Sequence, residues 1–287
     1  MTYITGTTQL LGVIGDPIKH SLSPVMHNAA LQEMGENYVY VPFSIKAKDL
    51  KTAIAGFETI GVKGFSVTIP HKLEIMPLLC EITKTAKLVG AVNTVWHTET
   101  GWKGTNTDVA GFLAPLKTLS HDWSQITPII LGNGGAARAV VVGCVELGCP
   151  EIHIVGRNLQ KLAEFQNSWA NLSSKVNIFT PDQLPELIPQ TQLLVNTTPV
   201  GMYPKTDESP VELRVLEKLA TGAIAYDLIY TPNPTQFLAQ ARQKGAIIID
   251  GLEMLLQQGA IALEIWTKKK PPIEIMRQSL KKHLKLN

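Results

Sequence analysis

Residues 129–137 read IILGNGGAA: three apolar residues run into a cluster of glycines, and a second apolar run, IHIVGRN, starts at Ile152. Gly132, Gly134 and Ala137 match the pattern G-x-G-x-x-G/A. In that pattern the first glycine permits a tight turn, the second lets the backbone approach a pyrophosphate, and the small third residue lets a helix pack on a strand. The free N–H groups and the positive dipole end of such a helix attract phosphates. A turn that binds no ligand would also contain glycines. The neighbouring residues therefore decide between a dinucleotide-binding loop and a simple turn.

The segment around the glycines has the length of a βαβ unit. A helix is predicted over residues 136–147, which Gly148 can end, and a second strand is predicted from Ile152. This context favours dinucleotide binding over an empty turn, and it predicts a Rossmann domain.

The residues after the second strand indicate which dinucleotide is bound. An NAD site usually has Asp or Glu there to hold the ribose 2′-hydroxyl, whereas this chain has Gly156, Arg157 and Asn158, with Lys161 one turn further on. The planar guanidinium of arginine can donate two parallel hydrogen bonds to a phosphate. The sequence therefore predicts NADP as the cofactor. The alternative is that Arg157 and Lys161 are solvated cations at the start of a helix.

Length and composition are those of an ordinary soluble globular protein. The chain has 287 residues, of which 45% are hydrophobic and 17% charged, so about two domains are expected. A net charge of +2 gives no basic patch that would indicate nucleic acid, and no apolar stretch reaches the roughly 18 residues that a membrane span needs. The first 16 residues lack the basic and apolar regions of a signal peptide. We therefore expect a cytoplasmic protein, a monomer or a homodimer, with a small-molecule substrate and no nucleic-acid or membrane partner.

The cysteines and histidines do not form a metal-binding pattern. Cys80, Cys144 and Cys149 are odd in number and lack ligand-like spacing, and His20 and His71 have no partner at metal-ligand spacing. We expect three reduced cysteines and no metal.

Strands and helices are predicted to alternate on both sides of the glycines. Strands are expected in LLGVIGD, YVYVPFS and GFSVT before them, and in VNIF, QLLVNTT, AIAYDLIY and AIIID after them. Residues 91–105 predict a hairpin, and the helix that opens at Asp108 should kink or stop at Pro115. Further helices are predicted near residues 48–59, over residues 252–267 and, with a basic composition, over residues 272–286.

Polar segments interrupt the apolar first part of the chain at predicted strand ends and helix starts. They are SLSP (21–24), VTIPHK (67–72), GAVNT (90–94) and GTNTD (104–108). Hydroxyl donors at a helix start favour an anion, so Ser21 can bind a carboxylate. Ser23 is followed by proline and could instead be the N-cap of a helix.

Lys72 and Asp108 are the candidates for proton transfer. Lys72 is predicted to begin a helix over residues 72–79, where the helix dipole disfavours a cation, so a purely structural lysine would gain little there. Asp108 opens the next helix and could simply cap it. If the two side chains meet in a cleft, one can take the proton of a substrate hydroxyl while the other holds the site, with Asn93 and Thr68 supplying orienting hydrogen bonds.

Taken in order, the segments SLSP, VTIPHK, GAVNT, NTD, GNGGAARA, NTTPVGM, YDLIYTP and DGLEMLLQQ resemble the motifs of the shikimate dehydrogenase family over essentially the whole chain. The resemblance implies reversible, NADP-dependent reduction of 3-dehydroshikimate to shikimate in aromatic amino-acid biosynthesis. It also implies an α/β fold of two domains. Residues 1–108 plus 251–287 would form a discontinuous substrate-binding domain with a mostly parallel sheet, and residues 109–250 a Rossmann NADP-binding domain.

The resemblance also implies roles for individual residues. Lys72 would be the catalytic lysine and Asp108 its partner. The substrate carboxylate would be held by Ser21, Ser23 and Tyr226, and the ring hydroxyls would contact Thr68, Asn93, Asp108 and Gln258. On the cofactor, the diphosphate would lie on Gly132, Asn133, Gly134, Gly135 and Ala136, the 2′-phosphate on Gly156, Arg157, Asn158 and Lys161, and the nicotinamide near Ile224, Gly251 and Met254. Tyr226 and Met254 could equally be core residues.

The chain departs from the family pattern in two places. The usual Asn-Arg-Thr at the 2′-phosphate reads Gly156-Arg157-Asn158, and a frequent second arginine is Lys161, so the selectivity for NADP over NAD is expected to be softer than usual. Lys84 stands where the family often has an acidic residue.

Two alternatives stay open. One is a quinate/shikimate dehydrogenase that prefers NAD; the absence of an acidic residue at position 157 and the two small serines argue against it. The other is a non-catalytic NADP-binding sensor, which should have lost the pair Lys72 and Asp108.

Overall fold

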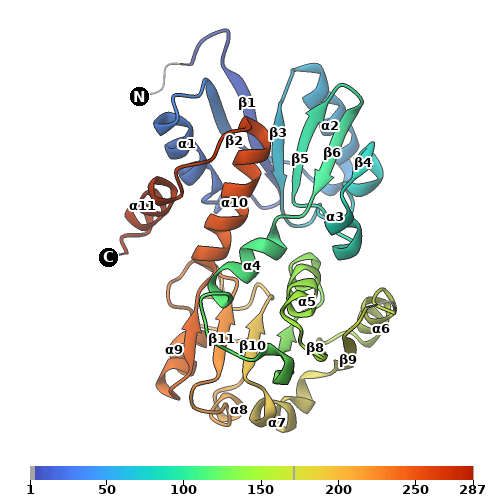
Figure 1. Ribbon diagram of the computed structural model, residues 1–287, viewed down its shortest axis with the longest axis vertical. Helices are drawn as coiled ribbons and strands as arrows, with labels where there is room; N and C mark the ends of the chain where they lie inside the picture. Colours follow the sequence, from blue (N-terminus) through green and yellow to red (C-terminus); the bar gives the residue numbers. More distant parts are fainter. Residues whose placement is uncertain (1–3, 171, 287) are drawn as a thin grey trace. The chain divides into compact units, whose positions relative to one another are not determined.

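The computed structural model describes residues 4–170 and 172–286, which fall into two compact units (Figure 1). Unit 1 comprises Met1–Gly111 and Leu255–Asn287, and unit 2 comprises Phe112–Met254. Each unit contains its own six-stranded sheet flanked by helices, which confirms the predicted α/β fold class. The assignment of the substrate to one unit and the cofactor to the other stays a prediction.

The sheet of unit 1 has the strand order β2-β1-β3-β5-β6-β4. Its strands are β1 (Gln9–Gly15), β2 (Tyr38–Ser44), β3 (Gly64–Val67), β4 (Glu81–Ile82), β5 (Thr94–Thr98) and β6 (Gly101–Thr105). β1 pairs in parallel with β2 and β3, and β4 in parallel with β6, whereas β5 is antiparallel to both β3 and β6. The β5–β6 pair confirms the predicted hairpin. Because β3 and β6 are both antiparallel to β5, they run in the same direction as β1.

Helices from both ends of the chain cover this sheet. They are α1 (Ser23–Glu33), α2 (Leu50–Thr59), α3 (Lys84–Val89), α10 (Gly251–Thr267) and α11 (Ile273–Leu284), with 3-10 turns at Ala47–Asp49 and Met76–Leu78. In Figure 1, α11 lies beside α1, against which it packs. Gly64 lets α10 approach β3, because a Cβ at this position would overlap the Trp266 ring. Trp266 Nε1 also donates to the Val95 carbonyl oxygen at 2.9 Å, so the C-terminal segment belongs to the N-terminal sheet.

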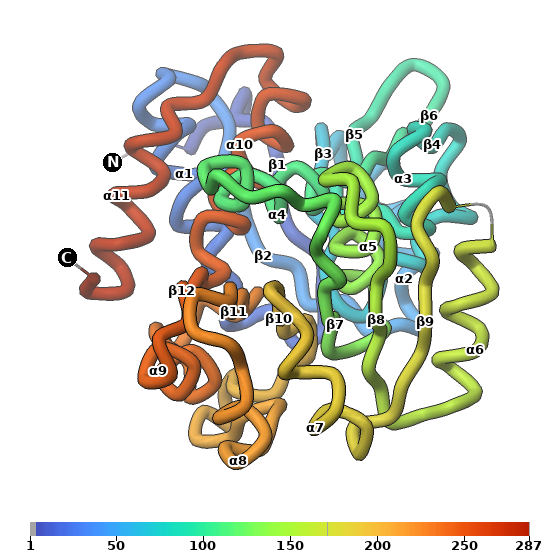
Figure 2. The backbone as a smooth tube through the Cα atoms, turned by 60° about the horizontal axis from the view of Figure 1, so that its bottom comes forward, coloured from blue at the N-terminus to red at the C-terminus, as the bar shows by residue number. Residues whose placement is uncertain are grey.

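The sheet of unit 2 is wholly parallel, with the order β12-β11-β10-β7-β8-β9 that Figure 2 shows. Its strands are β7 (Ile129–Leu131), β8 (Glu151–Val155), β9 (Lys175–Phe179), β10 (Leu193–Asn196), β11 (Ile224–Asp227) and β12 (Ile247–Ile249). The chain moves outward from β7 first through β8 and β9 and then, on the other side, through β10 to β12. Ligands bind at such a reversal of strand order, beyond the carboxyl ends of the strands.

Helices connect the strands of unit 2. They are α4 (Asp108–Leu116), which leads in from unit 1, α5 (Gly135–Leu147), α6 (Leu159–Asn167), α7 (Leu184–Leu187), α8 (Leu213–Leu216) and α9 (Gln236–Gln243), with 3-10 turns at Trp123–Gln125, Pro181–Gln183 and Ile188–Gln190. α5 ends at Gly148 in the left-handed conformation, as predicted. Pro115 lies in the last turn of α4.

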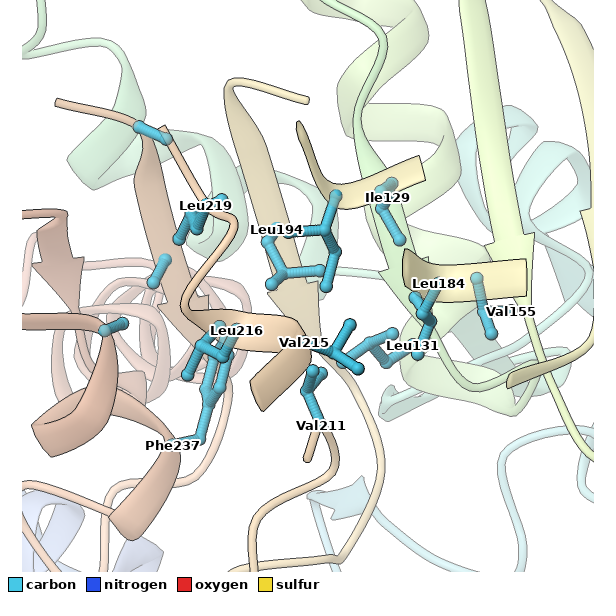
Figure 3. Close-up of a cluster of buried hydrophobic side chains, with 14 of the residues drawn as sticks. Ile129, Leu131, Val155, Leu184, Leu194, Val211, Val215, Leu216, Leu219 and Phe237 are labelled. Atoms are coloured by element: carbon cyan, nitrogen blue, oxygen red, sulfur yellow. The ribbon is translucent and has the colours of Figure 1, made fainter. Parts of the chain in front are cut away.

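One hydrophobic cluster fixes the strands of unit 2 relative to their helices (Figure 3). It joins Ile129 and Leu131 of β7 and Leu194 of β10 to Leu216 of α8 and Phe237 of α9, all almost completely buried. Burial of each such side chain contributes on the order of 1.5–3 kcal/mol. The core therefore holds β7 and β10 side by side, with their carboxyl ends at one edge.

Candidate active site

The four polar segments of unit 1 come together because of the strand directions. SLSP follows β1, VTIPHK ends β3 and extends beyond it, GTNTD ends β6 and extends beyond it, and GAVNT leads into β5, which is antiparallel to its neighbours. The carboxyl ends of three strands and the amino end of the fourth therefore lie at the same edge of the sheet. Side chains distant in sequence meet at this edge.

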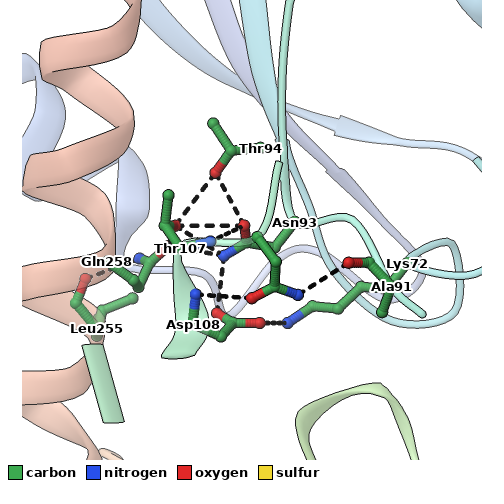
Figure 4. Close-up of polar contacts among 9 residues, drawn as sticks. Lys72, Ala91, Asn93, Thr94, Thr107, Asp108, Leu255 and Gln258 are labelled. Atoms are coloured by element: carbon green, nitrogen blue, oxygen red, sulfur yellow. Dashed lines mark hydrogen bonds and ion pairs between the residues drawn. The ribbon is translucent and has the colours of Figure 1, made fainter. Parts of the chain in front are cut away.

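Lys72 and Asp108 form a direct ion pair there. Lys72 Nζ lies 2.5 Å from Asp108 Oδ2, as Figure 4 shows. The Lys72 side chain is 15% exposed and that of Asp108 8%, so the pair is largely shielded from water but still reachable. Coulomb attraction is stronger in such a place than on the surface. The structure thus brings together the two groups that were predicted to transfer a proton.

Asn93 fixes the direction of the Asp108 carboxylate. Its Nδ2 donates to Asp108 Oδ1 at 2.8 Å, while its Oδ1 accepts from the Thr107 backbone N–H, also at 2.8 Å. The Asp108 backbone N–H in turn donates to Asn106 Oδ1 at 2.9 Å. Each carboxylate oxygen of Asp108 therefore has a separate donor, so the carboxylate has a defined orientation toward Lys72.

Gln258 joins this network from the far end of the sequence. Its Oε1 lies 3.4 Å from Asn93 Nδ2 and 3.5 Å from Thr107 Oγ1, and its Nε2 donates to the Leu255 carbonyl oxygen at 2.7 Å (Figure 4). α10 therefore contributes an amide to the site, and this contact is a second link between the two ends of the chain.

The predicted helix over residues 72–79 is wrong. Residues 70–75 are turns, and the 3-10 helix at Met76–Leu78 is the only helical element of this stretch. A helix there would place Pro77 in its interior, where proline has no N–H to donate, and the Lys72 carbonyl oxygen instead accepts from the Val92 N–H at 2.8 Å. Lys72 therefore does not begin an α-helix, and the charge beside it is the Asp108 carboxylate.

The hydroxyl residues lie at the same edge. Ser23 is the first residue of α1 and does not cap it, because Leu22 is the N-cap and makes no side-chain capping bond. The Ser23 N–H donates to Ser21 Oγ at 3.4 Å. Thr68 packs against β1 where Gly15 leaves room, since a Cβ at Gly15 would lie 2.6 Å from Thr68 Cγ2.

The glycine loop of unit 2 follows β7 and leads into α5. Gly132 has φ +104°, and a Cβ there would lie 2.7 Å from Thr197 Oγ1, so this position requires glycine on two grounds. Gly134 is the N-cap of α5 in an extended conformation, and a Cβ there would meet no atom within 4 Å. The backbone N–H groups of Gly134, Gly135 and Ala136 lie at the amino end of α5, where N–H groups have no acceptor within the helix, so they fit a diphosphate.

Arg157 and Lys161 are exposed at the carboxyl end of β8, where both can reach a ligand. Asn158 has a structural task, because its Oδ1 accepts from the Lys161 N–H at 3.0 Å and caps α6. Gly156 also has one, since a Cβ there would lie 2.9 Å from Leu162 Cδ2. The two cations are thus the strongest candidates for a 2′-phosphate in this segment.

The structure contradicts the roles predicted for Tyr226 and Ile224. Tyr226 is 0% exposed within β11 and stacks on Phe112 with ring centroids 5.2 Å apart, and burial raises the pKa of its hydroxyl. Ile224 is also fully buried, and it pairs with Leu193 at the amino ends of β11 and β10, at the edge opposite the glycine loop. Neither side chain can touch a ligand in this position.

Leu228 and Tyr230 are candidate site residues that the sequence does not predict. They follow the carboxyl end of β11 and are both half-buried. Leu228 donates its N–H to the Asn196 carbonyl oxygen at 3.1 Å, which places it at the same edge as the glycine loop. The segment AIAYDLIY is longer than the four residues of β11, so its second tyrosine, Tyr230, lies beyond the strand. The length of the segment could have indicated this.

Gly251 and Met254 begin α10. A Cβ at Gly251 would overlap the Leu228 backbone, so this glycine permits a close backbone approach. Met254 is buried. Lys84, where the family often has an acidic residue, is exposed at the first residue of α3.

A buried carboxylate ties the loops after β10 and β11 together. Asp227 Oδ1 accepts from Asn196 Nδ2 at 3.0 Å and from the Ile229 N–H at 3.1 Å, and Oδ2 accepts from Thr235 Oγ1 at 2.7 Å. Burial raises the pKa of Asp227 to about 6, although these hydrogen bonds act in the opposite direction. The network holds Leu228 and Tyr230 at the carboxyl edge.

This raised pKa predicts a pH-dependent stability. The carboxyl ionises at about pH 3.9 in the unfolded chain and only near pH 6 in the folded one. Its contribution to the free energy of unfolding is therefore complete below pH 4 and is lost as the pH rises through 6. Relative to Asp227→Asn, which does not titrate, the wild type should lose about 2–3 kcal/mol of unfolding free energy between pH 4 and pH 7. Denaturant unfolding at both pH values measures this. A difference in unfolding free energy between wild type and Asp227→Asn that is the same at pH 4 and pH 7 would contradict this prediction.

The structure also describes the candidate metal ligands, the helices and the cysteines. Among residues 4–170 and 172–286, no group of three His, Cys, Asp or Glu side chains could hold a metal ion. Within the same described part of the chain, no helix is long and apolar enough to cross a bilayer. Cys80 is exposed, Cys144 and Cys149 are buried, and all three are free thiols.

Comparison with known proteins gives consistent matches. Residues 13–95 match the family described as "Shikimate dehydrogenase substrate binding domain", and residues 251–281 match "Shikimate 5'-dehydrogenase C-terminal domain". A Gloeothece citriformis protein named "Shikimate dehydrogenase (NADP(+))" is 64% identical, with 100% of each chain covered. The structure is also similar to a Listeria monocytogenes shikimate 5-dehydrogenase solved with shikimate and NAD (34% identity, TM-score 0.85, 96% of this chain and 98% of that one). A Thermus thermophilus shikimate 5-dehydrogenase solved with NADP(H) and shikimate has 30% identity and a TM-score of 0.84, with 96% and 99% covered.

Proposed function

Because the chain belongs to the shikimate dehydrogenase family, we propose that it catalyses the reversible, NADP-dependent reduction of 3-dehydroshikimate to shikimate in aromatic amino-acid biosynthesis. The observation that carries this proposal is the ion pair of Lys72 and Asp108, held at 2.5 Å by the Asn93 network. A non-catalytic sensor would have no need for a shielded ammonium with a fixed carboxylate beside it.

Lys72 is the proton donor in the reductive direction. NADPH, when bound, supplies the hydride to the ring carbonyl carbon. The Lys72 ammonium donates its proton to the carbonyl oxygen, which becomes the hydroxyl, and the resulting amine recovers a proton from solvent. In the oxidative direction the neutral amine takes the proton of the substrate hydroxyl. Asp108 holds Lys72 in place through the ion pair.

Hydroxyl and amide groups, together with the Asp108 carboxylate, hold the substrate. Ser21 and Ser23 bind the carboxylate, and Thr68, Asn93, Asp108 and Gln258 contact the ring hydroxyls. The diphosphate of NADP would be held by Gly132, Asn133, Gly134, Gly135 and Ala136, and its 2′-phosphate by Arg157 and Lys161, with Gly156 and Asn158 shaping that loop. Gly251 and Met254 would contact the nicotinamide. Support comes from the shared sheet edge in unit 1 and from the glycine loop at the strand reversal in unit 2.

Tyr230 replaces Tyr226 as the tyrosine of the site, and Leu228 replaces Ile224, because both follow the carboxyl end of β11. Tyr230→Phe is expected to raise the KM for shikimate about 10- to 100-fold, since a lost hydrogen bond to a charged group costs about 1.5–3 kcal/mol. Tyr226→Phe, the matched variant inside β11, should leave that KM within twofold. Steady-state kinetics of both variants test this; the reverse ranking would restore Tyr226.

The proposed reaction has a simple test that separates the alternatives. Purified protein is mixed with NADP or NAD and with shikimate or quinate, and formation of the reduced cofactor is followed by absorbance. The proposal predicts rapid reduction of NADP with shikimate and slower reaction with the other three combinations. A preference for NAD, with quinate oxidised as readily as shikimate, would indicate the quinate/shikimate enzyme. No reduction at high protein concentration would indicate the sensor.

The place of action and the assembly state are part of the proposal. We propose that the protein works in the cytoplasm, where its small, charged substrates are dissolved, as a monomer or a homodimer. Cell fractionation with an antibody and sedimentation of the purified protein test these two statements.

A further inference from the structure

Tyr40 places a phenol inside unit 1 that the proposed mechanism does not use. It lies on β2, is 1% exposed, and donates from Oη to Ser66 Oγ on β3 at 2.9 Å. Its ring stacks on His27 with centroids 4.3 Å apart, and Trp266 packs against both rings. Because these neighbours are buried, the Tyr40 ring has one position and its hydroxyl one direction.

Two serine hydroxyls adjoin this phenol. Burial raises the pKa of Tyr40, while hydrogen bonding between its hydroxyl and the Ser66 and Ser23 side chains acts in the opposite direction. Tyr40 therefore stays protonated at neutral pH and has a single hydrogen to donate, which goes to Ser66. The hydrogen of the Ser66 hydroxyl is consequently not needed for this bond and can be donated elsewhere.

Ser66 lies next to the strand that leads from the Asn93 network. In the antiparallel β3–β5 register it is the direct partner of Thr94, so the two side chains share one face of the sheet. Thr94 Oγ1 donates to Asn93 Oδ1 at 3.0 Å, and Asn93 holds Asp108. The hydroxyl groups of Ser66 and Thr94 thus lie on this face between Tyr40 and the Asn93 network.

We propose that Tyr40 is a positioning residue for substrate binding. By donating to the Ser66 oxygen, its phenol turns the Ser66 hydroxyl hydrogen, beside Ser23, toward the carboxylate of the substrate. The inference rests on the proposed function and adds to it a residue that acts on the substrate only through Ser66. Neutral donors suit this task, since each hydrogen bond to an ionised acceptor is stronger than one between neutral groups.

Tyr40→Phe is the first test, because it removes the hydroxyl and keeps the ring stacked on His27. The KM for shikimate should rise about tenfold, with kcat within twofold and the KM for NADP unchanged, because the lost hydrogen bond acts on a charged ligand. Ser66→Ala should give a similar or larger rise. The double variant should be no worse than Ser66→Ala, since Tyr40 acts through that serine. Tyr38→Phe, a half-buried tyrosine on the same strand, is the control and should leave all three constants unchanged.

The methyl ester of shikimate tests the group that is recognised. As an inhibitor, it should bind wild type and Tyr40→Phe with inhibition constants within twofold of each other, because it lacks the anionic carboxylate. An equal loss of affinity for acid and ester would overturn the inference, as would an unchanged KM for shikimate in Tyr40→Phe. Effects of the two single variants that multiply in the double variant would also overturn it. A wild-type protein that does not oxidise shikimate would refute the proposed function instead, so the two failures are distinguishable.

Discussion

Lys72→Ala is expected to lower kcat roughly 10²–10⁴-fold, the usual contribution of a positioned acid or base, with little change in the KM for shikimate. The reason is geometric: Lys72 Nζ is the proton donor beside Asp108, whereas hydroxyls and amides at the same sheet edge supply the binding contacts. Initial rates of NADP reduction at saturating shikimate measure the effect. Lys51→Ala, which removes an exposed lysine on α2 of the same unit, is the matched control and should keep full activity.

Removal of Lys72 also leaves Asp108 buried without its cation, so folding has to be checked separately. Thermal unfolding and the dissociation constant for NADP should show that Lys72→Ala is folded and binds cofactor. A second variant, Lys72→Met, keeps most of the apolar stem and should lose turnover to the same extent. Near-normal turnover in either variant would exclude Lys72 as the proton-transfer residue.

Arg157→Ala is expected to reduce the preference for NADP over NAD about 10- to 100-fold, measured as the ratio of the two kcat/KM values. Hydrogen bonds between a guanidinium and a phosphate contribute about 1.5–3 kcal/mol, and this phosphate is absent from NAD. Most of the change should appear as a higher KM for NADP, with the NAD reaction unchanged. Because Arg157 is exposed, its replacement should not affect folding.

Arg214→Ala removes another exposed arginine of unit 2, on α8, and should leave the cofactor ratio unchanged. Lys161→Ala should reduce the ratio less than Arg157→Ala, because a lone ammonium binds phosphate through fewer fixed hydrogen bonds. Equal losses with NAD and NADP would mean that Arg157 supports the loop rather than the 2′-phosphate. An unchanged ratio would favour the view that Arg157 is a solvated cation.

The local features of the fold, such as turns and helix ends, could be predicted from the sequence. Gly132 and Gly148 adopt the left-handed conformations that only glycine takes easily, and their spacing determined the strand, turn and helix of the first βαβ unit. The β5–β6 hairpin was equally local. Such features depend on a few neighbouring residues, so the sequence is sufficient for them.

Contacts across the sheet could not be predicted in the same way. Lys72 and Asp108 are 36 residues apart, and their meeting depends on β3 and β6 running in the same direction on either side of β5. The Tyr40 hydrogen bond to Ser66 spans β1, so it required the complete strand order of unit 1. Gln258 needed the docking of α10 as well.

The errors had local causes. The helix predicted over residues 72–79 does not form because Pro77 lies inside that segment. Tyr226 and Tyr230 both follow apolar residues in AIAYDLIY, and only the end of β11 at Asp227 distinguishes the buried tyrosine from the one beyond the strand. Strand ends are determined by pairing partners, which the sequence of one strand does not reveal.

A structure of the wild-type protein with shikimate and NADP bound would test most directly whether Lys72 and Asp108 act on the reacting hydroxyl. The quantity to measure is the distance from Lys72 Nζ to the oxygen on the carbon that exchanges hydride. The proposed mechanism predicts about 2.6–3.2 Å, with the ammonium still in contact with Asp108. An oxygen out of reach of both head groups, with no water bridging the gap, would contradict it.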